Sequence, residues 1–209
     1  MDDIMITLPE TIKPNMELPD PTLIQIYRDR QNRVIWMLDE IGDEVYDWVD
    51  FILDVNREDD TNGTPIEKRK PIKCLIANRG GSVDAANTLV DIITLSKTPV
   101  WGIALGMCAS AASMIYLACH KRFALPSVSF LFHQGSCSNL SGNYSELKSF
   151  MDDYQTEIHS LTEFYKKHTT YDPALIEDKL SKGDWYIRVT EALENGVVHE
   201  VVNNISILL

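Results

Sequence analysis

The chain has 209 residues, of which 44% are hydrophobic, and a formal net charge of −12, which suits one globular domain with a sizeable core. The acidic balance argues against nucleic acid or an anionic membrane surface as a partner, and no apolar run reaches the roughly 18–20 residues that a membrane span needs. Since the N-terminus is acidic and lacks the features of a signal peptide, we expect a cytoplasmic protein.

The first part of the chain predicts an arm, a strand, a helix and a loop. Residues 1–22 contain four prolines and little periodicity, so we expect a loosely ordered arm before a domain over 23–209. Residues 33–38 predict a buried strand, and apolar residues at helical spacing predict an amphipathic helix over 43–55. Charges and turn residues over 56–71 predict a surface loop.

The rest of the chain alternates between strands and helices, which predicts an α/β fold with largely parallel pairing. The predicted elements are a strand (72–77), a helix (83–96), a strand (100–105), a helix after Gly106, two strands (122–126 and 128–133), a long helix (142–168), a helix (173–183) and a last helical turn (190–196). The long helix carries an apolar stripe that includes Leu147, Met151 and Ile158, and it has room to project from the domain.

The cysteines and histidines do not predict a metal site. The four cysteines form no C-x-x-C pair and three of them lie in apolar runs, which is typical of buried thiols in a reducing compartment. The five histidines show no H-E-x-x-H spacing. We therefore expect neither a metal nor a cofactor.

The stretch GMCASAASMIYLACH (106–120) contains two candidate nucleophiles, Ser110 and Ser113. Acyl transfer by a serine needs a base, a group that orients the base, and donors for the oxyanion. Ser110 lies where a strand ends and a helix begins, among small alanines. The first amides of a helix lack intrahelical acceptors, so the amide of Ala111 is a candidate donor.

Three further positions are candidates for the same chemistry, and each also has a purely structural interpretation. The amide of Gly81, after a strand, is a second possible oxyanion donor, or the glycine makes a tight turn. His133 ends a strand, at the edge of an α/β sheet where ligands bind, or it is a half-buried structural histidine. Asp184 follows a helix stop and is placed to orient His133 through Nδ1–H, or it is a turn aspartate.

In their order along the chain, four stretches resemble the proteolytic subunit of the Clp protease, the ClpP-like serine peptidase family. They are GGSVDAANTLVDIITLSKTPVWGIALGMCASAASM (80–114), KRFALP (121–126), FHQ (132–134) and GDWYIRVTEALENGVVHEVV (183–202). The family typically has a Gly-Gly-Ser-Val turn, a serine in a Gly-x-Ala-x-Ser-like stretch, a KRF-x-LP run, an HQP histidine and an aspartate before its EA…YGLVD segment.

The resemblance implies a ClpP/crotonase-like spiral of strand-strand-helix units with a projecting long helix. It also implies a serine endopeptidase with Ser110 as nucleophile, His133 as base, Asp184 as orienting acid, and Gly81 and Ala111 in the oxyanion hole. The partners it implies are a polypeptide substrate and a separate ATP-driven unfoldase. The stripe of the long helix is more apolar than a solvent-facing helix needs, which predicts a homo-oligomeric ring that stacks in pairs through this helix.

Several positions depart from the family pattern. Arg79 stands where the family has a proline, Gly183 stands where it often has an arginine used between rings, and Lys73 and Leu75 lie near its docking aromatics. Alternatives therefore stay open: a phage prohead maturation protease of the same fold, a crotonase-like acyl-CoA enzyme, or a non-catalytic ring subunit.

Overall fold

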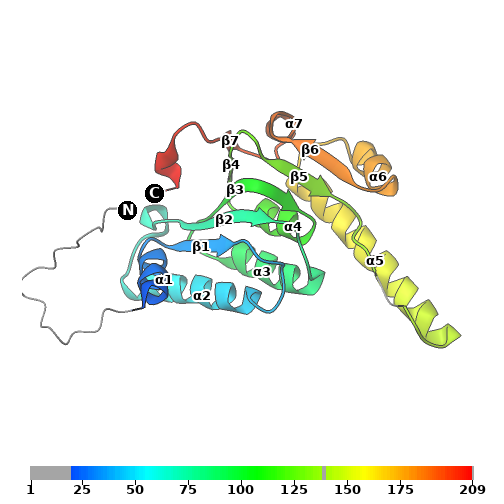
Figure 1. Ribbon diagram of the computed structural model, residues 1–209, viewed down its shortest axis with the longest axis horizontal. Helices are drawn as coiled ribbons and strands as arrows, with labels where there is room; N and C mark the ends of the chain where they lie inside the picture. Colours follow the sequence, from blue (N-terminus) through cyan, green and yellow to red (C-terminus); the bar gives the residue numbers. More distant parts are fainter. Residues whose placement is uncertain (1–19, 138–139, 209) are drawn as a thin grey trace, which may run out of the picture.

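The computed structural model describes residues 20–137 and 140–208, so most of the predicted arm, residues 1–19, lies outside the described residues. Pro21 and Thr22, which the prediction places in the arm, begin helix α1 (Pro21–Gln31) (Figure 1). The side chain of Asp20 caps this helix by accepting a hydrogen bond from the amide of Thr22 at 2.7 Å. The sequence pattern does not predict α1 because the helix has no buried face: none of its residues is buried.

A seven-stranded sheet forms the centre of the molecule (Figure 1). Its main path runs in the order β1-β2-β3-β4-β7, and β5 joins it through the end of β3. The strands are β1 (Val34–Met37), β2 (Ile72–Asn78), β3 (Val100–Ala109), β4 (Lys121–Ala124), β5 (Ser129–Phe132), β6 (Trp185–Arg188) and β7 (Glu200–Val201). Every pair is parallel except β5–β6, which confirms the predicted α/β fold with largely parallel pairing.

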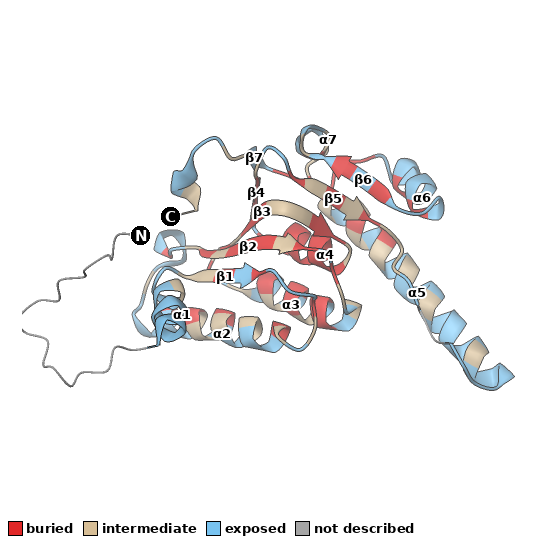
Figure 2. Cartoon of the chain, in the orientation of Figure 1, coloured by how far each residue is buried: buried red, intermediate tan, exposed pale blue. Residues whose placement is uncertain are grey.

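Helices α2, α3 and α4 pack against the sheet and share one hydrophobic core with it, coloured red in Figure 2. The long helix α5 packs on this body with its C-terminal part, and its N-terminal part projects away (Figures 1 and 2). The helices after α1 are α2 (Val45–Thr61), α3 (Val83–Leu95), α4 (Ala111–Ala118), α5 (Tyr144–His168), α6 (Pro173–Ser181) and α7 (Val189–Glu194), with 3-10 turns at Ile66–Lys68 and Ile205–Ile207. The projecting helix thus agrees with the expected architecture.

Two predicted boundaries are wrong for tertiary reasons. Helix α2 continues to Thr61, through the first part of the predicted loop 56–71. Its last turns are held by Asp59, whose carboxylate accepts two hydrogen bonds from Arg33 at 2.7 and 2.9 Å. Strand β3 continues past the predicted end at 105 because its last residues, 107–109, pair with β5.

A buried arginine joins the ends of several elements. The guanidinium of Arg122 donates to four backbone carbonyls, those of Leu117, His168, Gly196 and Val197. Nδ1 of His199 accepts the backbone N–H of Arg122 at 3.2 Å. Burial first, and neighbouring positive charges second, lower the pKa of His168 and of His199 below the usual value of 6.5. This part of the fold therefore favours neutral histidines.

Three cysteines, Cys74, Cys108 and Cys119, are buried free thiols, as expected from their apolar surroundings in the sequence, whereas Cys137 is exposed. Burial raises the pKa of the Cys108 thiol well above its usual range, so this thiol stays protonated. Among the described helices, none combines the length and the apolar character that a membrane crossing requires.

Candidate active site

Ser110 occupies the turn between β3 and α4, in a backbone conformation that is unusual for a residue with a side chain. Its φ is 54° and its ψ is −129°. Its amide donates to the carbonyl of Leu131 at 2.9 Å, and its carbonyl accepts from the amides of Ser113 at 2.8 Å and Met114 at 3.3 Å. These bonds hold the strained turn, which is typical of a serine presented at the end of a strand.

His133 directly follows β5 and faces this serine. Its Nε2 lies 2.6 Å from Oγ of Ser110, within hydrogen-bond distance. The parallel register of β3 and β5, which aligns Ala109 with Leu131, brings the two residues together at the same edge of the sheet. The imidazole is therefore in position to accept the hydroxyl proton.

Asp184 lies behind the histidine, at a longer distance. Strand β6 runs antiparallel to β5 and pairs Trp185 with Phe132, so the residue before Trp185 faces the residue after Phe132. Oδ1 of Asp184 is 3.6 Å from Nδ1 of His133, which is longer than a hydrogen bond. The carboxylate side chain is 54% exposed, so solvent screens its interaction with the imidazole.

Two other aspartates that lie near Asp184 in the sequence have their carboxylates engaged elsewhere. Oδ1 of Asp172 accepts the amide of Ala174 at 2.8 Å and caps α6. Asp178 forms an ion pair with Lys182 at 2.6 Å. Of these three aspartates, Asp184 is the one that the structure brings to His133.

The Gly80–Gly81 turn packs directly on the serine. A Cβ built on Gly80 would lie 2.7 Å from Cβ of Ser110 and 3.1 Å from the amide nitrogen of Ala111, and a Cβ on Gly81 would lie 2.2 Å from the carbonyl oxygen of Ile41. The φ values of the two glycines are 108° and 152°. Only glycine fits this turn, which places the backbone of Gly80 beside the first amide of α4 and the backbone of Gly81 against Ile41.

Ser113, the second candidate nucleophile, faces the interior. Its side chain is completely buried, and its hydroxyl donates to the carbonyl of Ser110 at 2.6 Å. A substrate carbonyl has no access to this buried hydroxyl. Ser113 instead stabilises the turn through its hydrogen bond to the Ser110 carbonyl.

Two hollows border the site and differ in character. One, of about 400 Å³, lies along the Gly80–Gly81 turn and contains the charged side chains Glu40 and Arg79. The other, of about 200 Å³, follows His133 and is lined by Phe150, Tyr154 and Leu161, all from α5. The hollow along the glycine turn thus has charged side chains in its lining, whereas the hollow after His133 has a larger share of apolar and aromatic ones.

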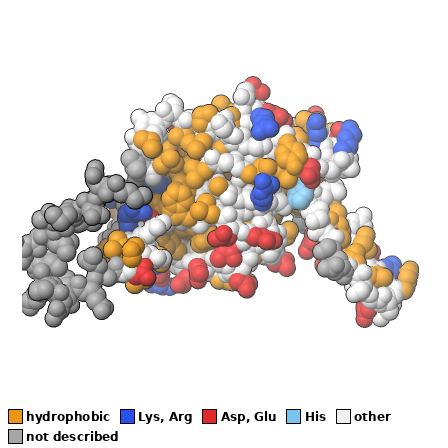
Figure 3. Space-filling view, in the orientation of Figure 1, with side chains coloured by type: hydrophobic (Ala, Val, Ile, Leu, Met, Phe, Trp, Pro, Cys, Tyr) orange, Lys and Arg blue, Asp and Glu red, His pale blue; other side chains and the backbone are white. Residues whose placement is uncertain are grey.

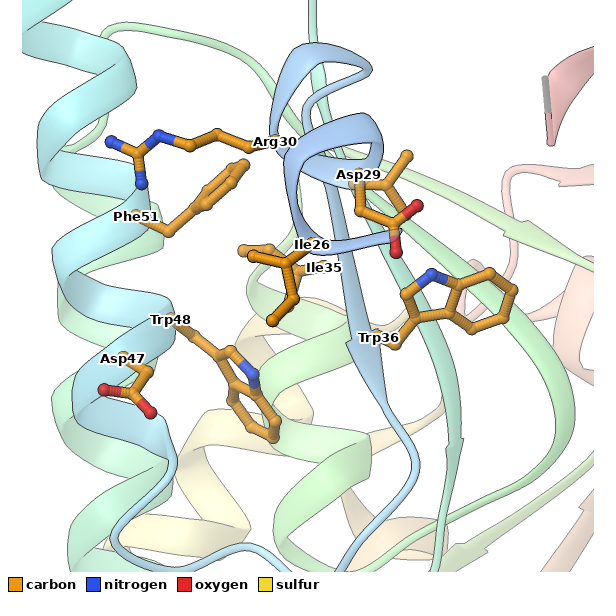
Figure 4. A pocket seen from close by; sticks show the side chains of 9 residues that line it. Ile26, Asp29, Arg30, Ile35, Trp36, Asp47, Trp48 and Phe51 are labelled. Carbon is orange, nitrogen blue, oxygen red and sulfur yellow. The ribbon is translucent and has the colours of Figure 1, made fainter. Parts of the chain in front are cut away.

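A third groove, of about 300 Å³, lies between α1, β1 and α2 and contains none of the five predicted site residues (Figure 4). It is rich in aromatic side chains, among them Trp36 and Trp48, and the guanidinium of Arg30 lies 5.6 Å from the centre of the Phe51 ring. It brings no serine or cysteine beside a histidine, so it offers no covalent chemistry.

The fold and the site together define the class of protein. A serine at a strained strand–helix turn, with a histidine at hydrogen-bond distance and a carboxylate behind it on an α/β sheet, is the arrangement of a serine-type peptidase. The sequence model of the family described as Clp protease matches residues 23–205. The chain belongs to the Clp protease family.

Curated relatives and a solved structure agree with this assignment. The chain is 29% identical to the "ATP-dependent Clp protease proteolytic subunit 2" of Treponema denticola over 137 residues, which is 65% of this chain and 68% of the relative. It is 29% identical over 139 residues to the protein of the same name from Borreliella burgdorferi, covering 66% of this chain and 69% of the relative. A structure of a ClpP1 mutant from Listeria monocytogenes superposes with a TM-score of 0.72 over 86% of this chain and 96% of that chain, at 24% identity, and this likeness concerns the fold alone.

Proposed function

We propose that this protein is a serine endopeptidase in which Ser110 is the nucleophile, His133 the general base and Asp184 the orienting acid. The observation that carries the proposal is the 2.6 Å separation of the Ser110 hydroxyl and Nε2 of His133 at a strained turn. The amides of Gly81 and Ala111 serve as oxyanion donors, which the packing of the glycine turn against Ser110 supports.

The proposed reaction follows from these positions. Nε2 of His133 takes the hydroxyl proton while Oγ of Ser110 attacks the scissile carbonyl carbon, and the negative charge on the carbonyl oxygen forms opposite the two amides. The imidazolium then gives its proton to the leaving amine, the C–N bond breaks, and an ester to Ser110 remains. Water, deprotonated by His133, cleaves the ester, releases the carboxylate product and restores the serine. Asp184 stabilises the imidazolium in both halves of the reaction.

The proposal extends to an assembly. We propose that residues 23–209 form one domain, and that copies of it close into a homo-oligomeric ring in the cytoplasm, which stacks on a second ring through α5. The support is apolar surface that a single copy leaves uncovered: Ile24 and Tyr27 on α1 are 52% and 67% exposed, and Phe150 and Met151 on α5 are 40% and 51% exposed. Figure 3 shows hydrophobic side chains gathered over the strands and along α5. A closed cyclic assembly covers such surface in every copy.

The substrate in this proposal is a polypeptide. The curated relatives are named as proteolytic subunits of an ATP-dependent protease, and a separate unfoldase is the corresponding partner here.

A fluorophosphonate probe tests the chemistry, because it modifies only a competent nucleophile. We expect labelling of the wild-type protein at Ser110, loss of labelling and of peptide hydrolysis in Ser110→Ala, and retention of both in Ser113→Ala. Loss of one member of such a triad typically leaves only about 10³–10⁴-fold acceleration over water. An unlabelled wild-type protein would point instead to a non-catalytic ring subunit or an acyl-CoA enzyme, and labelling at Ser113 would move the nucleophile.

Light scattering tests the assembly separately. We expect a mass of many copies at micromolar concentration, and a monomer would contradict the ring while leaving the chemistry of Ser110 to the labelling experiment.

A further inference from the structure

The peptide group between Gly80 and Gly81 is hydrogen-bonded through its carbonyl, which faces Ile41. The backbone N–H of Ile41 donates to the carbonyl of Gly80 at 2.9 Å, and the carbonyl of Ile41 accepts the amide of Ser82 at 2.8 Å. In a planar trans peptide the C=O and N–H groups point in opposite directions. Since Gly80 turns its carbonyl toward Ile41, the N–H of Gly81 points the other way.

The strand order shows which segment lies on the side toward which the N–H of Gly81 points. Ile41 belongs to the segment after β1, the two glycines follow β2, and Ser110 follows β3, while the sheet has the order β1-β2-β3. The N–H of Gly81 therefore points toward the serine side of the turn. Within residues 20–137 and 140–208, this N–H donates to no backbone carbonyl, so it is free for an oxyanion.

A buried asparagine ties the two sides of this arrangement together. Asn78 ends β2 and is 2% exposed. Its Oδ1 accepts the amide of Gly80 at 2.8 Å, and its Nδ2 donates to the carbonyl of Asp39, two residues before Ile41. Both partners are backbone groups, one able only to donate and the other only to accept, so the orientation of the carboxamide is determined. One side chain thus links the glycine turn to the segment that orients it.

We propose that Asn78 is a positioning residue for the oxyanion hole, acting by holding the Gly80–Gly81 peptide in the orientation that aims the Gly81 N–H at the site. Its carboxamide bonds to the backbone of Gly80 and Asp39, so it acts through the turn. No proline stiffens residues 77–82, so the turn is held by the two backbone bonds to Ile41 and by the carboxamide of Asn78. Misplacement of a group at an active site by about 1 Å lowers the rate by about 10²-fold.

The inference rests on the proposed function and is tested in the full-length protein with a fluorogenic peptide coumarylamide and a peptide boronate. The boronate forms a tetrahedral adduct on the serine and uses the same donors as the transition state. For Asn78→Ala we expect kcat per fluorophosphonate-titrated site to fall by about 10²-fold, boronate affinity to fall in proportion, and KM to stay the same. Asn78→Ser keeps an acceptor for the Gly80 amide, although a weaker one, and is expected to recover part of the loss.

Asn56→Ala is the matched control. Asn56 also links two segments through both ends of its carboxamide, accepting the amides of Lys97 and Thr98 at 3.0 Å and donating to the carbonyl of Ile52 at 2.8 Å, and it lies at the far end of α2 from the glycine turn. We expect this variant to lower the unfolding midpoint and leave kcat per titrated site and boronate affinity unchanged.

The outcomes separate the two proposals. If the wild-type protein turns over peptide but the Asn78 variants keep wild-type kcat per titrated site and boronate affinity, the role of Asn78 is refuted and the peptidase stands. If Asn78→Ala and the control Asn56→Ala lower kcat per titrated site equally, the effect is a general loss of structure and the inference is wrong. A wild-type protein that neither labels nor cleaves overturns the proposed function and this inference with it.

Discussion

The strained turn at Ser110, the proposed nucleophile, predicts that the protein tolerates glycine at this position better than alanine. A non-glycine residue in a sparsely populated conformation costs about 1–3 kcal/mol, and here φ is 54°. Ser110→Ala keeps that strain and Ser110→Gly relieves it, while both lose the hydrogen bond to His133. Against this gain stands the larger conformational entropy of an unfolded glycine, about 0.5–1 kcal/mol. Ser110→Gly is therefore expected to be more stable than Ser110→Ala by about 0.5–2 kcal/mol.

Thermal unfolding at fixed protein concentration measures this difference. For a chain of this size 1 kcal/mol corresponds to roughly 2–4 °C, so the midpoints should differ by roughly 1–8 °C with the glycine variant higher. Ser113 provides a control of opposite sign, because it lies inside α4, where glycine is less stable than alanine by about 1 kcal/mol. A Ser110→Gly protein that melts at or below Ser110→Ala would refute the idea that the turn stores strain.

Three further predictions concern the proposed orienting acid Asp184, the histidine beside Arg122 and the buried Ser113. Asp184→Asn should lower kcat by about 10²–10⁴-fold, measured per titrated site, and near-wild-type turnover would show that another group orients His133. Because the folded-state pKa of His199 is lowered, the stability it contributes is complete above about pH 6.5 and is lost as the pH falls below that value. His199→Asn keeps an acceptor for the Arg122 amide without a titrating group, so urea midpoints measured between pH 8 and pH 5 should decline less steeply than in the wild type. Ser113→Ala should cost about 1 kcal/mol of stability, the value of its hydrogen bond to the Ser110 carbonyl, and an unchanged midpoint would argue against that bond.

Local patterns in the sequence predict the alternation of strands and helices and the place of Ser110, because apolar periodicity and small residues act over a few positions. Helix α1 escapes such a pattern since it buries none of its residues. Strand β6 also escapes the prediction, although Trp185 and Ile187 are buried while Tyr186 and Arg188 are exposed, an alternation that a search for period-2 segments would find.

The candidate site residues are easier to predict from the sequence than the residues that hold them in position. The resemblance to the Clp protease family carries the residue types of the site, and the strand register brings Ser110 and His133 together. The brace formed by Asn78 joins residues 39 positions apart through one carboxamide, and no spacing within the sequence reveals such a contact. In the sequence Asn78 is visible only as part of a strand-end motif that differs from that of the family.

The antiparallel pair β5–β6 holds His133 and Asp184 with different numbers of neighbouring strands. Strand β5 is anchored to β3, so the position of His133 against Ser110 depends on the body of the sheet. Strand β6, which delivers Asp184, has β5 as its single strand partner among the described residues. Segments held on one side open locally at lower free energy than a core strand. We therefore expect fraying of β6 to withdraw the Asp184 carboxylate while Ser110 and His133 stay together, and amide hydrogen exchange should show residues 185–188 opening well before those of β3.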